Sequence, residues 1–383
     1  MNLSINEYNN NEVIGKAKLS NRFIRAFKPK LFESGGFPTT INSEQELVRY
    51  IDSMHAYSFE NHYNNLCKGI TEEEFELLKR TTKDIYNLTK EQYNSSFLVK
   101  APMIASICER RLINAAIGKD EKKRIFEIGG GSGTLGCILL EDGRKYISTD
   151  VTQAFYLIQN RLYNYINNKM NELAVEEYNP SSSCIHVPYW KMWETRNNPI
   201  DCDLVVSNHA LLEMSPNSIK FYLNYFRNSL YKNDGAFVFQ GGGWRINQNL
   251  IDLINLFDQY GYNLQYFDHK NEIAAFSVAY QEKCKDAVIK SLMKLISKLE
   301  TEDIYGLGKN IVSRLNEDEV YYVGKLGFKI NEIFDKINHE DKIAIEEVID
   351  FYNQFHDASL SPDEEFAEYI EPGSHVLRRI RKI

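Results

Sequence analysis

The sequence lacks the patterns that would place it in a metal-binding, membrane or nucleic-acid-binding class. Its six cysteines lie far apart, with no C-x-x-C pair and no histidine at zinc-ligand spacing, so we predict no essential metal. No stretch approaches the roughly 20 apolar residues that a membrane span needs. Lys and Arg number 45 against 53 Asp and Glu, so bulk charge gives no reason to expect nucleic-acid binding.

The chain is expected to be cytoplasmic and to contain more than one folding unit. Its first residues lack the apolar core of a signal peptide, and scattered thiols suit a reducing compartment. A length of 383 residues, 43% of them hydrophobic, predicts roughly two to three domains with ample material for a core. The polar, Asn-rich beginning of the chain is expected to be mobile.

Hydrophobic patterning divides the chain into three zones. Residues 1–121 and 282–383 show helical spacing of apolar residues, whereas residues 122–281 alternate short apolar runs with helical segments. Seven of these runs predict strands, at 124–128, 146–149, 184–187, 204–207, 236–240, 263–267 and 272–280. The alternation predicts an α/β core whose sheet is mostly parallel, covered by helices and closed by an antiparallel pair.

The segment RIFEIGGGSGTLG at residues 124–136 is the most informative stretch. A strand runs into four glycines and then into a helix, so the backbone can turn sharply and approach a ligand closely. Gly131, Gly133 and Gly136 satisfy the G-x-G-x-x-G pattern of dinucleotide-binding proteins, which leaves an NAD(P)-dependent oxidoreductase open. The same segment also reads E-x-G-x-G-x-G from Glu127, with an acid near the end of the strand.

This second pattern resembles the first motif of class I S-adenosylmethionine-dependent methyltransferases. The resemblance implies a Rossmann-like core with a seven-stranded sheet over residues 122–281, and S-adenosylmethionine as the cofactor. Asp150 ends the second predicted strand, at the spacing where an acid accepts hydrogen bonds from both ribose hydroxyls. The cofactor-binding residues that the resemblance implies are Glu127, Gly129, Gly130, Gly131, Gly133, Asp150, Tyr189, Trp190 and Asn208.

The segment SNHALLEM at residues 207–214, after the fourth predicted strand, resembles bacterial sugar O-methyltransferases. The resemblance implies methyl transfer to a hydroxyl of a sugar or glycan, with methylation of a peptide or secondary metabolite as the alternative. His209 is the predicted general base, and Glu213 either orients its imidazole or binds sugar hydroxyls. Trp244 and Arg245, after the fifth predicted strand, are expected to contact the acceptor.

The helical zones need a role of their own, because the middle zone already supplies the sheet and the cofactor loop. Apolar stripes on these helices have to be buried against other surfaces. We predict that the N-terminal helices cover the cofactor cleft and select the acceptor, a small molecule or glycan. The C-terminal helices are expected to pack on the outer face of the core or to form a homodimer contact. His186, inside the third predicted strand, is interpreted as an interior residue with satisfied hydrogen bonds.

Overall fold

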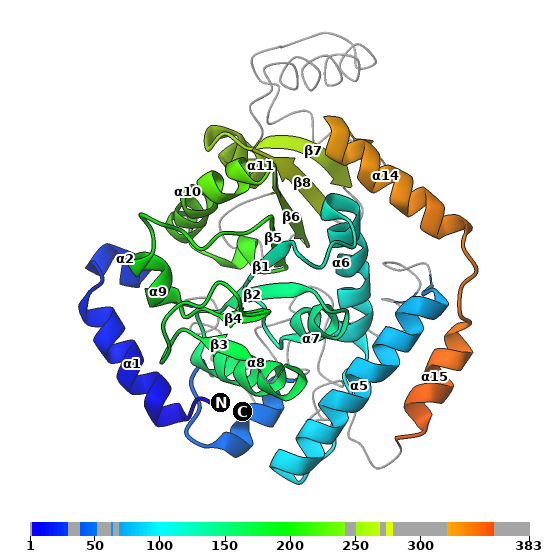
Figure 1. The fold of residues 1–383 in the computed structure, drawn as a ribbon, viewed down its shortest axis with the longest axis horizontal. Helices are drawn as coiled ribbons and strands as arrows, with labels where there is room; N and C mark the ends of the chain where they lie inside the picture. Colours follow the sequence, from blue (N-terminus) through cyan, green and yellow to red (C-terminus); the bar gives the residue numbers. More distant parts are fainter. Residues whose placement is uncertain are drawn as a thin grey trace, which may run out of the picture. The chain divides into compact units, whose positions relative to one another are not determined.

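The computed structural model describes residues 2–29, 39–51, 63, 69–167, 169–241, 250–268, 273–278, 320–322 and 324–355. Over these residues the protein is an α/β structure whose strands form parallel and antiparallel pairs (Figure 1). Contacts along the backbone divide the chain into two units. The first contains residues 1–110, 129–195 and 337–383, and the second contains residues 111–128 and 196–336. The division into zones at residues 121 and 281 stays a prediction.

Three parallel strands form the sheet of the first unit, in the order β3-β4-β2. Their bounds are Lys145–Thr149 for β2, Met170–Glu172 for β3 and Cys184–His186 for β4. Cys184 is paired with Tyr146 of β2 on one side and with Met170 of β3 on the other. The pairing of β4 with β2 and its pairing with β3 therefore both begin at Cys184, the first residue of β4. All three strands are buried almost throughout, as expected for parallel strands covered on both faces.

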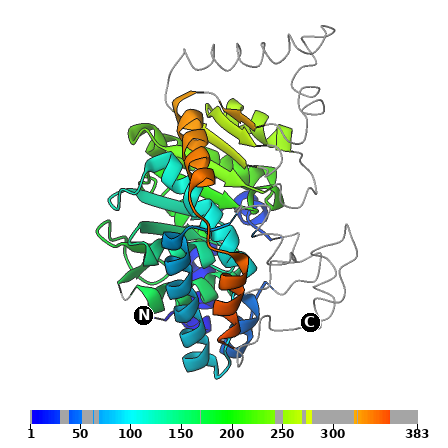
Figure 2. The ribbon, with the colours of Figure 1, turned by 90° about the vertical axis from the view of Figure 1, so that its right-hand side faces the viewer.

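Helices of the first unit pack around these strands. Their bounds are Ile5–Ala17 (α1), Asn21–Ala26 (α2), Glu44–Tyr50 (the 3₁₀ helix η1), Glu72–Tyr93 (α5), Thr134–Glu141 (α7), Gln153–Ile166 (α8), Tyr189–Glu194 (α9) and Ile345–Asn353 (α15). Thr71 and Glu74 form the capping box of α5, whose sequence spacing marks this start. Helices α5 and α15 run side by side (Figure 2), where Phe75 meets Phe351 edge-on with ring centroids 6.0 Å apart.

The beginning of the chain is helical, in contrast to the mobile segment expected from its composition. Ser4 and Glu7 form a capping box at the start of α1, which satisfies backbone donors that a helix end leaves free. Tyr8 then packs on Tyr156 of α8 and on Trp190 of α9, with both ring centroids 5.2 Å away. These two aromatic contacts bury Tyr8 completely and fix the helix to the first unit.

Six strands of the second unit lie in the order β1-β5-β6-β8-β7-β9. Their bounds are Arg124–Ile128 (β1), Leu204–Asn208 (β5), Ala236–Gln240 (β6), Asn263–Asp268 (β7), Ile273–Ser277 (β8) and Val320–Tyr322 (β9). The first three strands are parallel, with Ile125 opposite Leu204 and Leu204 opposite Ala236. Pairing becomes antiparallel from β6 onward.

The helices of the second unit are α10 (Pro216–Lys232), α11 (Leu250–Gln259) and the short η3 (Leu211–Glu213). The Ser215 hydroxyl caps α10 by accepting from the backbone N–H of Ser218, and Pro216 occupies the first helical turn. Two further helices cross the unit boundary along the chain, α6 (Ala101–Ile117) and α14 (Gly324–His339).

The predicted Rossmann-like α/β fold class, with helical segments on both sides of the core, is confirmed. The seven predicted strands correspond to β1, β2, β4, β5, β6, β7 and β8. The sheet has two further strands, β3 and β9, each of three residues. The apolar stripe that was expected to form a helix around residues 288–299 lies outside the described residues.

Contact between α1 and α9 can be tested at Gly15. A Cβ atom added there would lie 2.3 Å from Cδ1 of Trp190, far inside contact distance. In an unobstructed helix Gly→Ala stabilises by about 0.5–1 kcal/mol. We expect Gly15→Ala to destabilise the chain instead, by about 1–3 kcal/mol, because a buried indole has to move. Urea denaturation measures the difference.

The double variant Gly15→Ala/Trp190→Leu provides the control for this clash. When Leu replaces Trp190, the Gly15→Ala substitution should lower the free energy of unfolding by less than it does in the presence of the native indole. A stabilising Gly15→Ala would contradict the described packing of α1 on α9.

Candidate cofactor and acceptor sites

The glycine loop follows β1 and consists of residues 129–133. Gly129, Gly131 and Gly133 have φ angles of +72°, +53° and +80°, in the left-handed region that side chains other than glycine rarely adopt. The backbone N–H of Gly129 bonds to the carbonyl oxygen of Thr149 at 2.9 Å, and Gly133 is the N-cap of α7. The predicted sharp turn between a strand and a helix N-terminus is therefore present.

Asp150 lies beside this loop, at the end of β2, and is only 6% exposed. Its Oδ1 atom accepts from the backbone N–H and the hydroxyl of Thr152, at 2.9 and 2.6 Å. Its Oδ2 atom accepts from the backbone N–H of Gly131 at 3.2 Å. Burial raises the pKa of Asp150, and the hydrogen bonds from Thr152, Gly131 and Gln159 oppose that rise. The structure thus brings together two predicted cofactor residues, Asp150 and Gly131.

Gln159 of α8 holds the same two groups and was not identified from the sequence. Its Nε2 atom donates to the carbonyl oxygen of Gly131 at 2.8 Å and to Oδ2 of Asp150 at 3.4 Å. Gln159 is completely buried on a helix that otherwise buries mainly apolar residues. A polar residue on the apolar face of a predicted helix is the sequence signal that could have indicated it.

Tyr189 and Trp190, the predicted adenine contacts, are the first two residues of α9. Trp190 is 1% exposed and contacts α1, and the Tyr189 hydroxyl donates to Glu12 of α1 at 3.2 Å. The Tyr189 ring also stacks on Phe27, with centroids 6.1 Å apart. Their described contacts are with the N-terminal helices, and their role toward a cofactor stays a prediction.

The second unit carries the remaining described residues of the predicted site. Glu127 is buried in β1 opposite Val206 of β5. Asn208 ends β5, and His209 follows it with a φ angle of +55°, a left-handed conformation that a non-glycine residue adopts at a cost of order 1–3 kcal/mol. Glu213 ends η3, four residues after His209, and is partly exposed.

Contacts with β6 hold His209 in this conformation. Its backbone N–H donates to the carbonyl oxygen of Gln240 at 2.8 Å. Its ring lies against the backbone of Gly241, where an added Cβ would be 1.9 Å from Nδ1. Only glycine fits at position 241, because of this approach and because of its own φ angle of +84°.

Two buried amide oxygens lie next to His209. Asn208 and Gln240 are paired in register at the ends of β5 and β6. Neither Oδ1 of Asn208 nor Oε1 of Gln240 has a hydrogen-bond partner among the described residues. A buried acceptor without a donor costs free energy, so this end of the two strands is suited to a ligand that brings N–H or O–H donors. Gln240 was not predicted.

Three predictions remain: the role of Trp244 and Arg245, the absence of an essential metal, and the absence of a membrane span. Trp244 and Arg245 fall outside the described part of the chain, and their role stays a prediction. Within the described ranges, no three His, Cys, Asp or Glu side chains are placed to hold a metal ion. None of the described helices is long and apolar enough to cross a membrane.

Comparison with known proteins gives structural similarities at low scores. No protein-family model and no curated protein matches the chain. A TehB-like methyltransferase from Corynebacterium glutamicum is 18% identical, covering 44% of this chain and 85% of its own, with a TM-score of 0.33. A Podospora anserina methyltransferase with bound S-adenosylhomocysteine is 11% identical, with coverages of 58% and 94% and a TM-score of 0.33. Magnesium protoporphyrin IX methyltransferase from Synechocystis, with bound S-adenosylmethionine, is 9% identical, with coverages of 62% and 98% and a TM-score of 0.31.

The buried carboxylate of Asp150 predicts a specific pH dependence of stability. Because its pKa is raised above the ordinary value of 3.8, protonation favours the folded chain over the unfolded chain. The contribution of Asp150 to the free energy of unfolding should therefore increase as pH falls from neutral through the raised pKa toward 3.8.

Thermal unfolding of the wild type and of Asp150→Asn between about pH 7 and pH 4 measures this contribution. The melting temperature of the wild type relative to the variant should rise on acidification. A difference that stays constant, or that shrinks as pH falls, would contradict the raised pKa.

Proposed function

We propose that the chain is an S-adenosylmethionine-dependent methyltransferase that acts on a hydroxyl of a sugar or glycan. The observation that carries the cofactor is the buried Asp150 carboxylate at the end of β2, bonded to the loop that follows β1. In an α/β sheet this position suits recognition of a ribose by a carboxylate. The absence of a pyrophosphate in S-adenosylmethionine agrees with an acid, Glu127, just before the loop.

The residues around Asp150 fit a nucleoside. The two N–H···O bonds to Oδ2, at 3.2 and 3.4 Å, are longer than the roughly 2.9–3.0 Å typical of such bonds, so Oδ2 can accept a stronger, charge-assisted bond from a ribose hydroxyl. A Cβ atom built on Gly131 would meet nothing within 4 Å, which leaves open space directly beside the carboxylate. Thr149, the residue before Asp150, has a buried hydroxyl without a partner among the described residues.

His209 is proposed as the general base. When bound, S-adenosylmethionine supplies an electrophilic methyl group. A sugar hydroxyl is a weak nucleophile at neutral pH, and the imidazole would accept its proton as the new oxygen–carbon bond forms. The left-handed backbone of His209 and its contact with Gly241 hold the ring in one place, which supports a positioned base over a solvated histidine.

Methylation of a nitrogen or an oxygen in a peptide or secondary metabolite is the second candidate. The oxygens of Asn208 and Gln240, without partners among the described residues, are compatible with it, because they can receive N–H donors as readily as O–H donors. Substrate panels should therefore include amines beside sugars, nucleotide sugars and oligosaccharides.

Cofactor binding is tested by calorimetry with S-adenosylhomocysteine. Asp150→Ala should weaken binding by about 2–4 kcal/mol, because two charge-assisted hydrogen bonds to ribose are lost. Gly131→Val should also weaken binding sharply, since the side chain fills the open space beside Asp150 and strains a φ angle of +53°.

Gly118→Val is the matched control for Gly131→Val. Gly118 also has a positive φ angle, +74°, and open space at its Cβ position, but it follows α6 outside the loop. This variant should lose stability and keep its affinity for S-adenosylhomocysteine. Tight binding of NADH with no binding of S-adenosylhomocysteine would refute the assignment and favour an oxidoreductase.

The base is tested with tritiated S-adenosylmethionine and the acceptor panel. His209→Ala should lower turnover by roughly two to four orders of magnitude and leave S-adenosylhomocysteine affinity nearly unchanged. Gly241→Ala should reduce turnover as well, because the added methyl group displaces the imidazole. Full activity of His209→Ala would transfer the role to another residue, with Glu213 the next candidate.

A further inference from the structure

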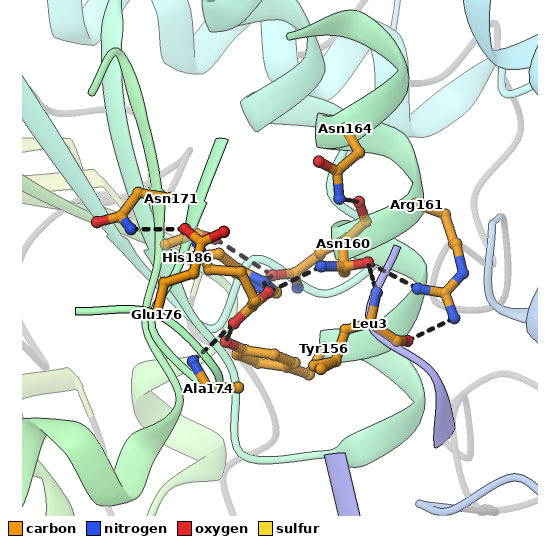
Figure 3. A network of polar contacts seen from close by, with 12 residues as sticks. Leu3, Tyr156, Asn160, Arg161, Asn164, Asn171, Ala174, Glu176 and His186 are labelled. Carbon is orange, nitrogen blue, oxygen red and sulfur yellow. Dashed lines mark hydrogen bonds and ion pairs between the residues drawn. The ribbon is translucent and has the colours of Figure 1, made fainter. Parts of the chain in front are cut away.

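A row of buried polar side chains leads from the glycine loop into the interior of the first unit. Figure 3 shows its inner part, with His186, Tyr156 and Asn160. Gln159 contacts the loop, and its Oε1 atom lies 3.3 Å from Nε2 of His186. Nδ1 of His186 lies 2.8 Å from Oε2 of Glu172, which also accepts from Nδ2 of Asn160 at 2.8 Å. None of these four side chains contributes to the chemistry described above.

The surroundings of Gln159 determine which atom of its amide is which. Nε2 faces two acceptors, the carbonyl oxygen of Gly131 and the carboxylate of Asp150, so this position has to be the donor. Oε1 is then an acceptor. It accepts from the Ser148 hydroxyl at 3.4 Å and also faces Nε2 of His186. His186 has to donate a proton through Nε2 to make this contact.

The surroundings of Glu172 indicate that Nδ1 of His186, the other ring nitrogen, also faces an acceptor. Oε1 of Glu172 accepts from the Tyr156 hydroxyl and from the backbone N–H of Ala174, and burial raises the pKa of Tyr156 well above 10.0, so its phenol keeps its proton. Oε2 accepts from Asn160. A carboxyl group with donors at both oxygens has the hydrogen-bond pattern of an ionised carboxylate. Nδ1 of His186 therefore also faces an acceptor.

Both ring nitrogens of His186 thus face acceptor atoms, Oε1 of Gln159 and Oε2 of Glu172. The ring is completely buried beside the Glu172 carboxyl group. The Tyr156 ring stacks on it with centroids 3.7 Å apart and planes inclined by 17°. A buried pair of this kind needs hydrogen bonds to all its remaining atoms, and here it has them.

We propose that the His186–Glu172 pair is a positioning pair for the cofactor loop, acting through Gln159. Nε2–H of His186 holds the Gln159 amide in the one orientation in which it can donate to Gly131 and Asp150. The proposal rests on the proposed cofactor. It assigns His186 a positioning role and no contact with the reacting atoms.

The far end of the row is closed by the beginning of the chain. Oδ1 of Asn160 accepts from the backbone N–H of Leu3 at 2.9 Å and from Arg161 at 2.6 Å. Arg161 also donates to the carbonyl oxygen of Leu3 at 2.7 Å. Asn160 is therefore fixed from both sides, and its Nδ2 is held toward Glu172.

Two conservative variants separate the contacts of the two ring nitrogens. In His186→Gln, the amide nitrogen lies as many bonds from Cα as Nε2 does, so a donor to Gln159 is retained. In His186→Asn, the amide nitrogen matches Nδ1 and retains the donor to Glu172 only. We expect His186→Asn to weaken S-adenosylhomocysteine binding about tenfold, and His186→Gln to stay within about twofold of the wild type.

The melting temperatures of both variants are measured in parallel. They should not rank the variants in the same order as the affinities for S-adenosylhomocysteine. His186→Gln loses a partner of a buried carboxylate and should have the lower melting temperature of the two. Asn171→Ala is the control. Asn171 precedes Glu172 on β3 and bonds to Glu176 and Asn179 rather than to the row. It should lose stability and keep its affinity.

Two outcomes separate failure of the positioning role from failure of the proposed function. If wild-type protein binds S-adenosylhomocysteine and affinity simply follows melting temperature across these variants, the positioning role is wrong and the proposed function stands. If wild-type protein binds no S-adenosylhomocysteine, the proposed function is wrong and the positioning role falls with it.

Nitrogen-15 NMR of histidine-labelled, full-length protein tests the pair without any cofactor. The signal that disappears in His186→Gln belongs to His186. Its Nε2 should have the chemical shift of a protonated ring nitrogen, because it faces the acceptor Oε1 of Gln159. An Nε2 with the shift of an unprotonated nitrogen would overturn the proposed pair even if the variants fail to fold.

Discussion

The buried carboxylate of Asp150 is the interaction around which the first unit is organised. An ionised carboxylate with little access to water is stable only when donors surround it, and here the donors come from two places, the glycine loop and helix α8 with its N-cap. Thr152 supplies two donors from the start of α8, Gly131 supplies one from the loop, and Gln159 supplies one from two turns further along α8. The position of the loop relative to the strand is a consequence of satisfying this one charge.

The same constraint explains why polar residues extend so far behind the loop. Gln159 can hold Gly131 and Asp150 only if its other amide atom is satisfied inside the unit. Ser148 and His186 contact that atom, Glu172 contacts the other ring nitrogen of His186, and Asn160 and Tyr156 donate to Glu172. Each buried polar group requires the next, until the row reaches the backbone of Leu3. This row of hydrogen bonds therefore connects the N-terminal segment to the glycine loop.

The sequence predicted those parts of the fold that depend on the pattern of neighbouring residues. The seven strands and the glycine turn depend on residues close together in sequence. Helix α1 was missed although Ser4 and Glu7 show capping-box spacing, because the Asn-rich composition was given more weight. β3 has a composition, Met-Asn-Glu, with little strand preference, and it forms because β4 offers it an edge.

Of the candidate site, the sequence predicted the residues at strand ends and missed those that support them. Asp150 directly follows β2, His209 directly follows β5, and Gly131 lies three residues after the end of β1, so the strand pattern in the sequence locates all three. Gln159 and Gln240 were missed because their importance depends on neighbours that are remote in the chain, Gly131 and Asn208 respectively. For Trp190, the fold places a helix glycine, Gly15, against the indole, a contact that no local pattern reveals.

A crystal structure of the chain with S-adenosylhomocysteine is the most direct test of the central claim. The account predicts both ribose hydroxyls within about 3 Å of the Asp150 carboxylate, with the ligand in the space beside Gly131. The Gln159 amide should still bond to the carbonyl oxygen of Gly131. A ribose bound elsewhere, with Asp150 keeping only its bonds to Thr152, Gly131 and Gln159, would contradict it.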